Sequence, residues 1–279
     1  MSPFELVEPG SLREAIAALR ETEGAVRPMS GGTAIMLMMK AGVLRPTRLV
    51  TLRRLGLDRI ERGPGGELRV GAMVPLRKLE TSALVRQEWG VLARTLRTLS
   101  NVRVRNVATV GGHLAHGDPH MDLPPLLSAL GATVTIAGPK GERSWPVEAL
   151  YAGYLETTLG AGELITQLQV PPMAGKRAAY LKCTTRSVDD WPALGMAVVL
   201  GEKQVGIVMS AATDKPTRLV AAEAVLNGKA LNDGLIRQAA EAAREVQIES
   251  DLHGSAAYKK HLVGVYLARA IHEARNAGH

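Results

Sequence analysis

The sequence predicts an α+β fold, and two observations at opposite ends of the chain lead to this class. Residues 1–56 alternate helical patterns with β-leaning runs, as in a small βαβ-like unit. From about residue 177 onward, strand-like runs are followed by three helical patterns, an order that indicates α+β architecture. With 279 residues, the chain is long enough to form more than one core.

A domain boundary is expected near residue 176, shortly after the Pro171-Pro172 pair, where the character of the chain changes. The C-terminal part should contain a small antiparallel sheet and three helices. The expected domains are residues 1–176, with subdomains of about 1–56 and 57–176, and residues 177–279.

The first helix is expected to begin after Ser11, because Ser11 and Glu14 form a capping box and apolar residues recur at helical spacing from Leu12 to Leu19. Further helices are expected at 33–40, near 75–85 and 89–99, from 122 to 130, and near 216–226, 232–247 and 255–276. Strands are expected at 25–29, 49–52, 68–73, 132–136, 164–170, 178–184, 194–200 and 205–211, the last two as an antiparallel pair.

Two glycine pairs are the most informative local feature, and they occur in Ser30-Gly31-Gly32-Thr33-Ala34 and Thr109-Val110-Gly111-Gly112-His113. Successive N–H groups in a tight glycine turn form an anion-binding concavity, and the missing Cβ lets a ligand approach closely. Two such turns suit the pyrophosphate of a dinucleotide cofactor. The alternative is that they are two ordinary turns.

Composition excludes several classes of protein. The net charge is +7 and the pI is near 9.7, yet aromatic residues make up only 3% of the chain and no helix-turn-helix or zinc-finger pattern is present. An acidic protein partner or a phosphate group therefore explains the net positive charge better than nucleic acid does. No apolar run is long enough to span a membrane, and the start Met1-Ser2-Pro3-Phe4-Glu5 lacks the pattern of a secretory signal.

The single cysteine, Cys183, excludes an internal disulfide framework and a self-contained iron–sulfur cluster, and it suits a reducing cytoplasm. No nucleophile elbow or paired-carboxylate motif is present, so no catalytic residue is expected.

The segment from His113 to Asp122 contains three histidines and two aspartates, which are residue types that zinc uses. The spacing of the histidines would suit a helix, but Gly117 and Pro119 disfavour one. We therefore expect a polar turn rather than a metal site, with Asp118 and Asp122 fixing the backbone or accepting ligand hydroxyls.

Several segments, in order along nearly the whole chain, resemble the FAD-binding medium subunit of molybdenum-containing hydroxylases, a group that includes aerobic carbon monoxide dehydrogenase, xanthine dehydrogenase and 4-hydroxybenzoyl-CoA reductase. The segments that carry the resemblance are Ser30-Gly31-Gly32-Thr33, Arg105-Asn106-Val107-Ala108-Thr109-Val110-Gly111-Gly112, Ala115-His116-Gly117-Asp118-Pro119 with Asp122, Gly162-Glu163-Leu164-Ile165, Tyr180-Leu181-Lys182 with Arg186 and Asp189-Asp190, and Asp251-Leu252-His253-Gly254-Ser255-Ala256-Ala257-Tyr258.

This resemblance implies a two-part FAD-binding domain of the vanillyl-alcohol-oxidase (PCMH) type, followed by a smaller α+β domain. It implies that the glycine turns hold the pyrophosphate, that Asp122 bonds a ribose, that Ile165 makes a main-chain contact and that Lys182 lies near the flavin. The expected cofactor-binding residues are Met29, Ser30, Gly31, Gly32, Thr33, Ala34, Ile35, Asn106, Thr109, Gly111, Gly112, His113, Asp118, Asp122, Ile165, Tyr180 and Lys182.

The resemblance also implies the partners: a small subunit with two [2Fe-2S] clusters and a large molybdopterin subunit, in a dimer of heterotrimers. The chain would pass electrons between those clusters and an external acceptor. Two alternatives remain, a self-sufficient flavin reductase of the same fold class and a non-enzymatic basic binding domain. The chain departs from the family at Ser30 and Ala34, where alanine and a polar residue are commoner, and at His113, which replaces a frequent asparagine.

Overall fold

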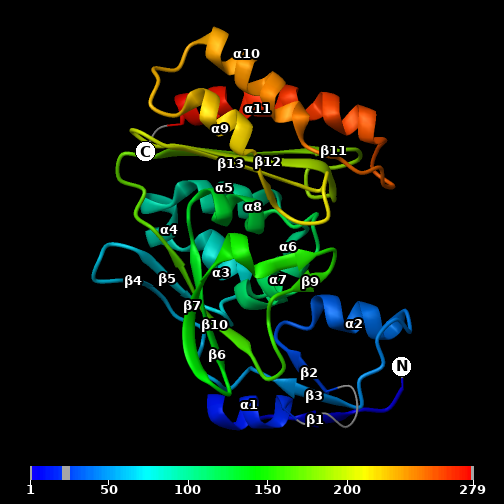
Figure 1. The fold of residues 1–279 in the computed structure, drawn as a ribbon. Helices are drawn as coiled ribbons and strands as arrows, with labels where there is room; N and C mark the ends of the chain where they lie inside the picture. The colour runs from blue at the N-terminus through cyan, green and yellow to red at the C-terminus, as the bar shows by residue number, and fades with distance from the viewer. Residues whose placement is uncertain (1, 21–25, 278–279) are drawn as a thin grey trace.

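The computed structural model describes residues 2–20 and 26–277, which stack as three layers along the long axis of the molecule (Figure 1). The N-terminal segment forms the layer at one end, and the C-terminal sheet with its helices forms the layer at the other. Met1, in the start of the chain discussed above, and Ala25, the first residue of the strand expected at 25–29, lie outside the described residues. Within the described ranges, no helix combines the length and the apolar content needed to cross a membrane.

The N-terminal layer is a parallel three-stranded sheet with the order β1-β3-β2. Its elements are β1 (Glu5–Val7), α1 (Leu12–Leu19), β2 (Val26–Met29), α2 (Thr33–Lys40) and β3 (Arg48–Thr51). The expected Ser11 cap is confirmed, because its side chain accepts a hydrogen bond from the Glu14 N–H. The Glu14 carboxylate accepts a hydrogen bond from the N–H of Gly10, one residue before the cap. The β2–α2–β3 segment is the expected βαβ-like unit.

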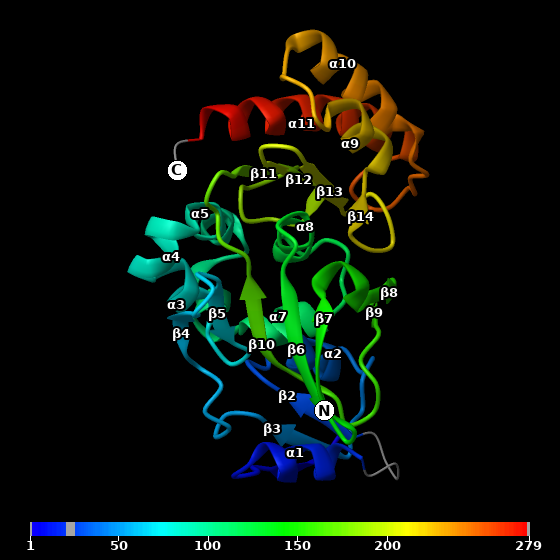
Figure 2. The same cartoon turned by 60° about the vertical axis from the view of Figure 1, so that its left-hand side comes forward.

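The middle layer contains an antiparallel sheet with the order β4-β5-β10-β6-β7 and a group of short helices. In Figure 2 the strands of this sheet are seen side by side, and helices α3, α4 and α5 lie to their left. Its strands are β4 (Ile60–Arg62), β5 (Leu68–Gly71), β6 (Thr133–Gly138), β7 (Gly141–Pro146) and β10 (Leu164–Val170). Its helices are α3 (Leu76–Thr81), α4 (Ala83–Glu88), α5 (Gly90–Thr98), α6 (Val102–Val107), α7 (Val110–Ala115) and α8 (Leu123–Ala129). A 3₁₀ turn (Val147–Leu150) leads into the hairpin of β8 (Tyr151–Gly153) and β9 (Glu156–Thr157).

The C-terminal layer is an antiparallel four-stranded sheet with helices α9, α10 and α11 on its outer face and α5 and α8 beneath it (Figures 1 and 2). Successive residues of β12 point to opposite faces: Val198 belongs to the core under the outer helices, and Val199 to the core shared with the middle layer. The elements are β11 (Arg177–Thr184), β12 (Pro192–Leu200), β13 (Val205–Ser210), β14 (Thr217–Arg218), α9 (Val220–Leu226), α10 (Asp233–Ala242), a 3₁₀ turn (Ala243–Glu245) and α11 (Ala256–Asn276).

The structure differs from the sequence expectations mainly in short elements. The helix expected near 75–85 is two helices, because Ser82 ends α3 and its side chain caps α4 by accepting a hydrogen bond from the Val85 N–H. Residues around the second glycine pair, expected as a turn, form α6 and α7, which are separated only by Ala108 and Thr109.

Candidate functional site

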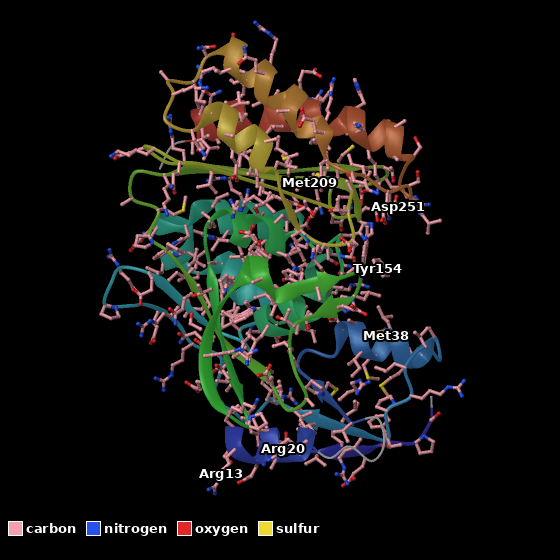
Figure 3. The ribbon with its side chains drawn as sticks, viewed as in Figure 1. Arg13, Arg20, Met38, Tyr154, Met209 and Asp251 are labelled. Atoms are coloured by element: carbon pink, nitrogen blue, oxygen red, sulfur yellow. The ribbon has the colours of Figure 1, made fainter. Side chains whose placement is uncertain are left out.

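A cavity of about 920 Å³ lies where the N-terminal layer, the middle layer and the start of the C-terminal sheet meet. Its volume is near the upper end of the ~300–1,000 Å³ range of ligand sites. Met38, on α2, lines this cavity, and in Figure 3 it lies on the same side of the molecule as Tyr154 and Asp251, which line a second cavity of about 450 Å³. His120 and Trp191 line both cavities, so the two cavities adjoin each other.

The first glycine pair presents free backbone donors to the large cavity. Gly32 is the N-terminal cap of α2 with a φ of 76°, a left-handed conformation that favours glycine. Within the described part of the chain, neither the Gly31 N–H nor the Gly32 N–H donates to a protein acceptor. The N–H groups in the first turn of a helix also lack intrahelical acceptors. This loop can therefore bind an anion.

The second glycine pair has a different role from the one expected. The Gly111 N–H donates to the Ala72 carbonyl at 2.8 Å, and the Gly112 N–H donates to the Thr109 hydroxyl at 3.2 Å. The expectation of a second set of bare N–H groups is therefore wrong for these two glycines. Both line the cavity, but their N–H groups are already satisfied inside the protein.

The glycines instead allow the loop before α2, the start of α7 and Ala72, which follows β5, to pack closely against one another. A Cβ on Gly111 would lie 2.6 Å from the Cβ of Ala72, and one on Gly112 would lie 2.9 Å from the Ser30 hydroxyl oxygen. A Cβ on Gly31 would overlap the Val107 carbonyl. The Ser30 and Thr109 hydroxyls share a hydrogen bond across this contact. Three of the four glycines are thus required by packing of the cavity wall.

A buried polar triad closes the cavity at the C-terminal sheet. Asp122 accepts hydrogen bonds from the Tyr180 hydroxyl at 2.6 Å and from the Lys182 ammonium at 3.0 Å, so each carboxylate oxygen already has a partner. The Asp122 and Lys182 side chains are only 5% and 7% exposed. Burial raises the pKa of Asp122, while the Lys182 charge and the two hydrogen bonds oppose that rise. Burial and the Asp122 charge raise the pKa of Tyr180 well above its ordinary value.

The histidine-rich loop follows α7 and lines the same cavity. His113 lies in the last part of α7, and His116 is the residue at its C-terminal end. Burial lowers the pKa of His113 to about 3 and also lowers the pKa of His116. The Nε2 atom of His113 is buried and has no hydrogen-bond partner. Within the described residues, no group of three or more histidine, cysteine or acidic side chains is placed to hold a metal ion.

Most of the residues proposed from the sequence are brought together around this cavity. Those that line it are Ser30, Gly31, Gly32, Thr33, Ala34, Ile35, Thr109, Gly111, Gly112, His113, Asp122, Ile165 and Lys182. Four lie elsewhere: Met29 and the exposed Asn106 are outside the lining, Tyr180 lies behind Asp122, and Asp118 lines the second cavity.

Sequence reasoning missed other lining residues, among them Arg27, Met38, Ser100 and Trp191. Trp191 could have been suspected, because it is one of only three tryptophans and follows two aspartates in a polar segment. Nothing in the sequence around Ser100 indicated a lining position.

Comparison with known proteins identifies the class to which this fold and cavity belong. Residues 2–173 match the model of the FAD binding domain in molybdopterin dehydrogenase, and residues 179–274 match that of the CO dehydrogenase flavoprotein C-terminal domain. The chain belongs to this family of FAD-binding medium subunits, it is an oxidoreductase component, and FAD is its cofactor.

Individual relatives align over nearly the whole chain. The medium chain of carbon monoxide dehydrogenase from Afipia carboxidovorans is 32% identical, with 98% of this chain and 96% of that protein covered. The glyceraldehyde dehydrogenase medium chain of Sulfolobus acidocaldarius is 29% identical, with 97% and 98% covered. A solved structure of carbon monoxide dehydrogenase from Hydrogenophaga pseudoflava superimposes with a TM-score of 0.93 at 32% identity, with 98% of each chain covered. These matches confirm the family resemblance and the expected α+β fold class.

Proposed function

We propose that the 920 Å³ cavity holds FAD with its pyrophosphate at the start of α2 and that the chain passes electrons between partner [2Fe-2S] clusters and an external acceptor. The observation that carries the proposal is the free N–H groups of Gly31 and Gly32 on the cavity wall, since an anion needs such donors. When bound, a flavin supplies one- and two-electron transfer. The protein groups bind and orient it.

The remaining lining residues are assigned by position. Ser30 to Ile35 would surround the pyrophosphate, Ile165 would make a main-chain contact, and Asp122 would accept a ribose or ribityl hydroxyl beside its two existing partners. The residues farther from the lining, Met29, Asn106, Asp118 and Tyr180, would act by supporting those that touch the cofactor.

Lys182 is proposed to tune the flavin. Its ammonium lines the cavity while bonded to Asp122 and, at 3.2 Å, to the Asp190 carbonyl. A cation near the isoalloxazine favours anionic reduced forms, so Lys182→Met should lower the flavin potential in a redox titration.

The partners follow from the relatives. Several relatives are named as medium chains or subunits of dehydrogenases, and one solved relative is described by reference to its molybdenum cofactor. We propose a small iron–sulfur subunit and a large molybdopterin subunit, assembled as a cytoplasmic dimer of heterotrimers. The single Cys183 supports this division, because an iron–sulfur cluster on this chain would need about four thiolates.

Two domains divided near residue 176 are also proposed. The separate family matches at 2–173 and 179–274 support this division.

The test is Gly32→Val with FAD and FMN as titrants of the purified full-length chain. A Cβ at Gly32 meets only side-chain atoms at 3.6 Å or more, so the variant should fold with about 1–2 kcal/mol of backbone strain. Gly228→Val is the matched control, because Gly228 has a φ of 70° and open space around it. Wild type and Gly228→Val should bind FAD in preference to FMN, and Gly32→Val should lose FAD. Full flavin occupancy in Gly32→Val would overturn the pyrophosphate assignment.

A further inference from the structure

Two segments about 130 residues apart meet at His120. The His120 Nδ1 atom is 2.9 Å from an Asp118 carboxylate oxygen, and Nε2 is 3.2 Å from an Asp251 carboxylate oxygen. The His120 ring also contacts the rings of Trp191 and His253, with centroids 5.3 and 5.2 Å away. The His120 side chain is only 11% exposed. Thus one imidazole joins the loop after α7 to the loop before α11.

A second set of contacts joins the same loop to the end of β13. The Ala211 N–H donates to the Pro119 carbonyl at 2.9 Å, and the Lys259 ammonium donates to the Ala211 carbonyl at 2.7 Å. Lys259 is 1% exposed and pairs with Asp251 at 2.6 Å. We call Asp118, His120, Asp251 and Lys259 the His120 clamp. The clamp fixes the 118–120 loop to the C-terminal layer.

The other side of this loop belongs to the cofactor cavity. His116, Met121 and Asp122 line it, and His120 lines both the large and the second cavity. Any movement of the 118–120 backbone would therefore move residues of the cavity wall. The His120 clamp therefore holds the loop whose neighbouring residues form part of the wall of the large cavity.

Four segments pack against His120. The Trp191 segment carries Asp190, whose carboxylate accepts a hydrogen bond from the Trp191 N–H. Asp118 lies in the same loop as His120, Asp251 and His253 come from the loop before α11, and Lys259 of α11 reaches His120 through Asp251. His113 and His116 also interact electrostatically with the Asp118 carboxylate. Burial alone would lower the pKa of His120. The hydrogen bonds and charges of Asp118 and Asp251 raise that pKa by more than burial lowers it, so it is raised overall.

Hydrogen-bond chemistry makes the clamp depend on protonation. Both ring nitrogens donate in the imidazolium form, whereas the neutral ring donates from one nitrogen only. A carboxylate accepts but does not donate. Neutral His120 therefore leaves one of the two aspartates without its bond.

We propose that His120 is a positioning residue, which as the imidazolium couples the C-terminal layer to the 116–122 wall of the cofactor cavity. The proposal rests on the proposed FAD site. Loss of the proton loosens the loop and weakens cofactor binding.

The first arm of the test needs no flavin. In the cofactor-free full-length protein, the His120 imidazole should titrate by NMR above the ordinary histidine value of 6.5, and Asp251→Asn should lower the His120 midpoint by about one pH unit. Hydrogen exchange in 116–122, corrected for the intrinsic rate, should show less protection at high pH than at low pH in wild type. His120→Gln should remove that difference, and His272→Gln should keep it.

The second arm uses FAD as the ligand. The FAD dissociation constant of wild type and His272→Gln should rise about five- to tenfold from slightly acidic to slightly alkaline pH, and that of His120→Gln should not change. A His120 midpoint at or below the ordinary value of 6.5, or equal pH dependence in wild type and His120→Gln, would overturn the proposal. If wild type binds no FAD at any pH, the FAD site fails, and the first arm still decides the clamp. If Asp251→Asn does not fold, His120→Gln decides it.

Discussion

His113 and His120 interact with the same carboxylate, Asp118, yet their pKa values move in opposite directions. His113 is buried with an unpartnered Nε2 atom, so burial dominates and favours the neutral ring. His120 is held between two carboxylates that outweigh its burial. The local count of hydrogen-bonding partners therefore decides the sign of each shift.

Acid should destabilise the protein through His113. Its pKa is about 3 in the folded state against an ordinary value of 6.5, so between these values the unfolded chain binds a proton that the folded chain does not. The stability due to neutral His113 is complete above pH 6.5 and is lost as the pH falls. The free energy of unfolding should drop by about 2 kcal/mol from pH 7 to pH 5 on this account. Urea unfolding should show a smaller drop in His113→Asn; the same drop in both proteins would contradict it.

The Asp122–Lys182 pair should stabilise the fold as well as the cofactor. Removing one partner leaves the other charge buried, so Asp122→Ala should cost about 3–5 kcal/mol of unfolding free energy without FAD. The double variant Asp122→Ala with Lys182→Met should cost less than the sum of the single changes, because no charge then remains unpaired. Strict additivity in chemical unfolding would show that the two groups do not interact.

At the scale of elements, the contact between the loop before α2 and the start of α7 defines the cavity wall. The two segments are tied by the Ser30–Thr109 hydroxyl contact and by glycines that leave no room for a side chain. Arg105, in the last turn of α6, ties this helix to its neighbours. Its guanidinium pairs with buried Glu80 at 2.9 Å and donates to the Leu99 carbonyl at 3.0 Å. Arg105 is buried, so its charge is used inside the protein and is not presented at the surface.

Gly111→Ala should destabilise the cofactor-free protein, in contrast to the simple view that this glycine only leaves space for phosphate. The new Cβ would lie 2.6 Å from the Ala72 Cβ and 3.0 Å from the Ala72 carbonyl oxygen. That oxygen belongs to the backbone and cannot move aside as a flexible side chain would. Overpacking of this kind costs about 1–3 kcal/mol. Gly10→Ala is the control, because its Cβ would meet only the Glu14 carboxylate at 3.7 Å. Equal thermal stability of the two variants would refute the packing role.

Long periodic elements could be predicted from the sequence, and short ones could not. The Ser11 cap and the apolar spacing after it identified α1, and the apolar run of β12 identified a buried strand. Helices α6 and α7 have six residues each, too few for a periodic pattern, and their glycines favoured a turn. Backbone donors at Gly31 and Gly32 were predictable from residue type. Ala72, which contacts Gly111, and Asp251, which pairs with His120, come from distant segments, so no local pattern could reveal these contacts.

At the scale of the whole molecule, the C-terminal sheet is built into the middle layer. One core includes Val134 and Leu168 of the middle sheet together with Val199 and Val208 of the C-terminal sheet. Arg218 adds a polar link, because its guanidinium donates to Glu148 and to the Ser128 carbonyl in the middle layer. The two layers therefore depend on each other for burial of apolar surface.

Gly206→Ala should weaken this junction. Its Cβ would lie 2.6 Å from the carbonyl oxygen of Ala129 at the end of α8, so β13 and α8 would have to move apart at a cost of about 1–3 kcal/mol. Because the core is shared, tryptophan fluorescence and far-ultraviolet circular dichroism should report one coincident urea transition in both proteins. Two separate transitions in wild type would show that the layers unfold independently.

The residues of the cavity wall are spread along the sequence, and this spread affects when the cavity can form during protein synthesis. Its lining extends from Arg27 to Pro192, so the ribosome must have passed Pro192 before the last part of the wall exists. Segments made earlier, such as the α3–α5 helices, can begin to fold during translation. A flavin can be fully enclosed only afterwards, so enclosure of the cofactor follows synthesis of β11 and of the start of β12.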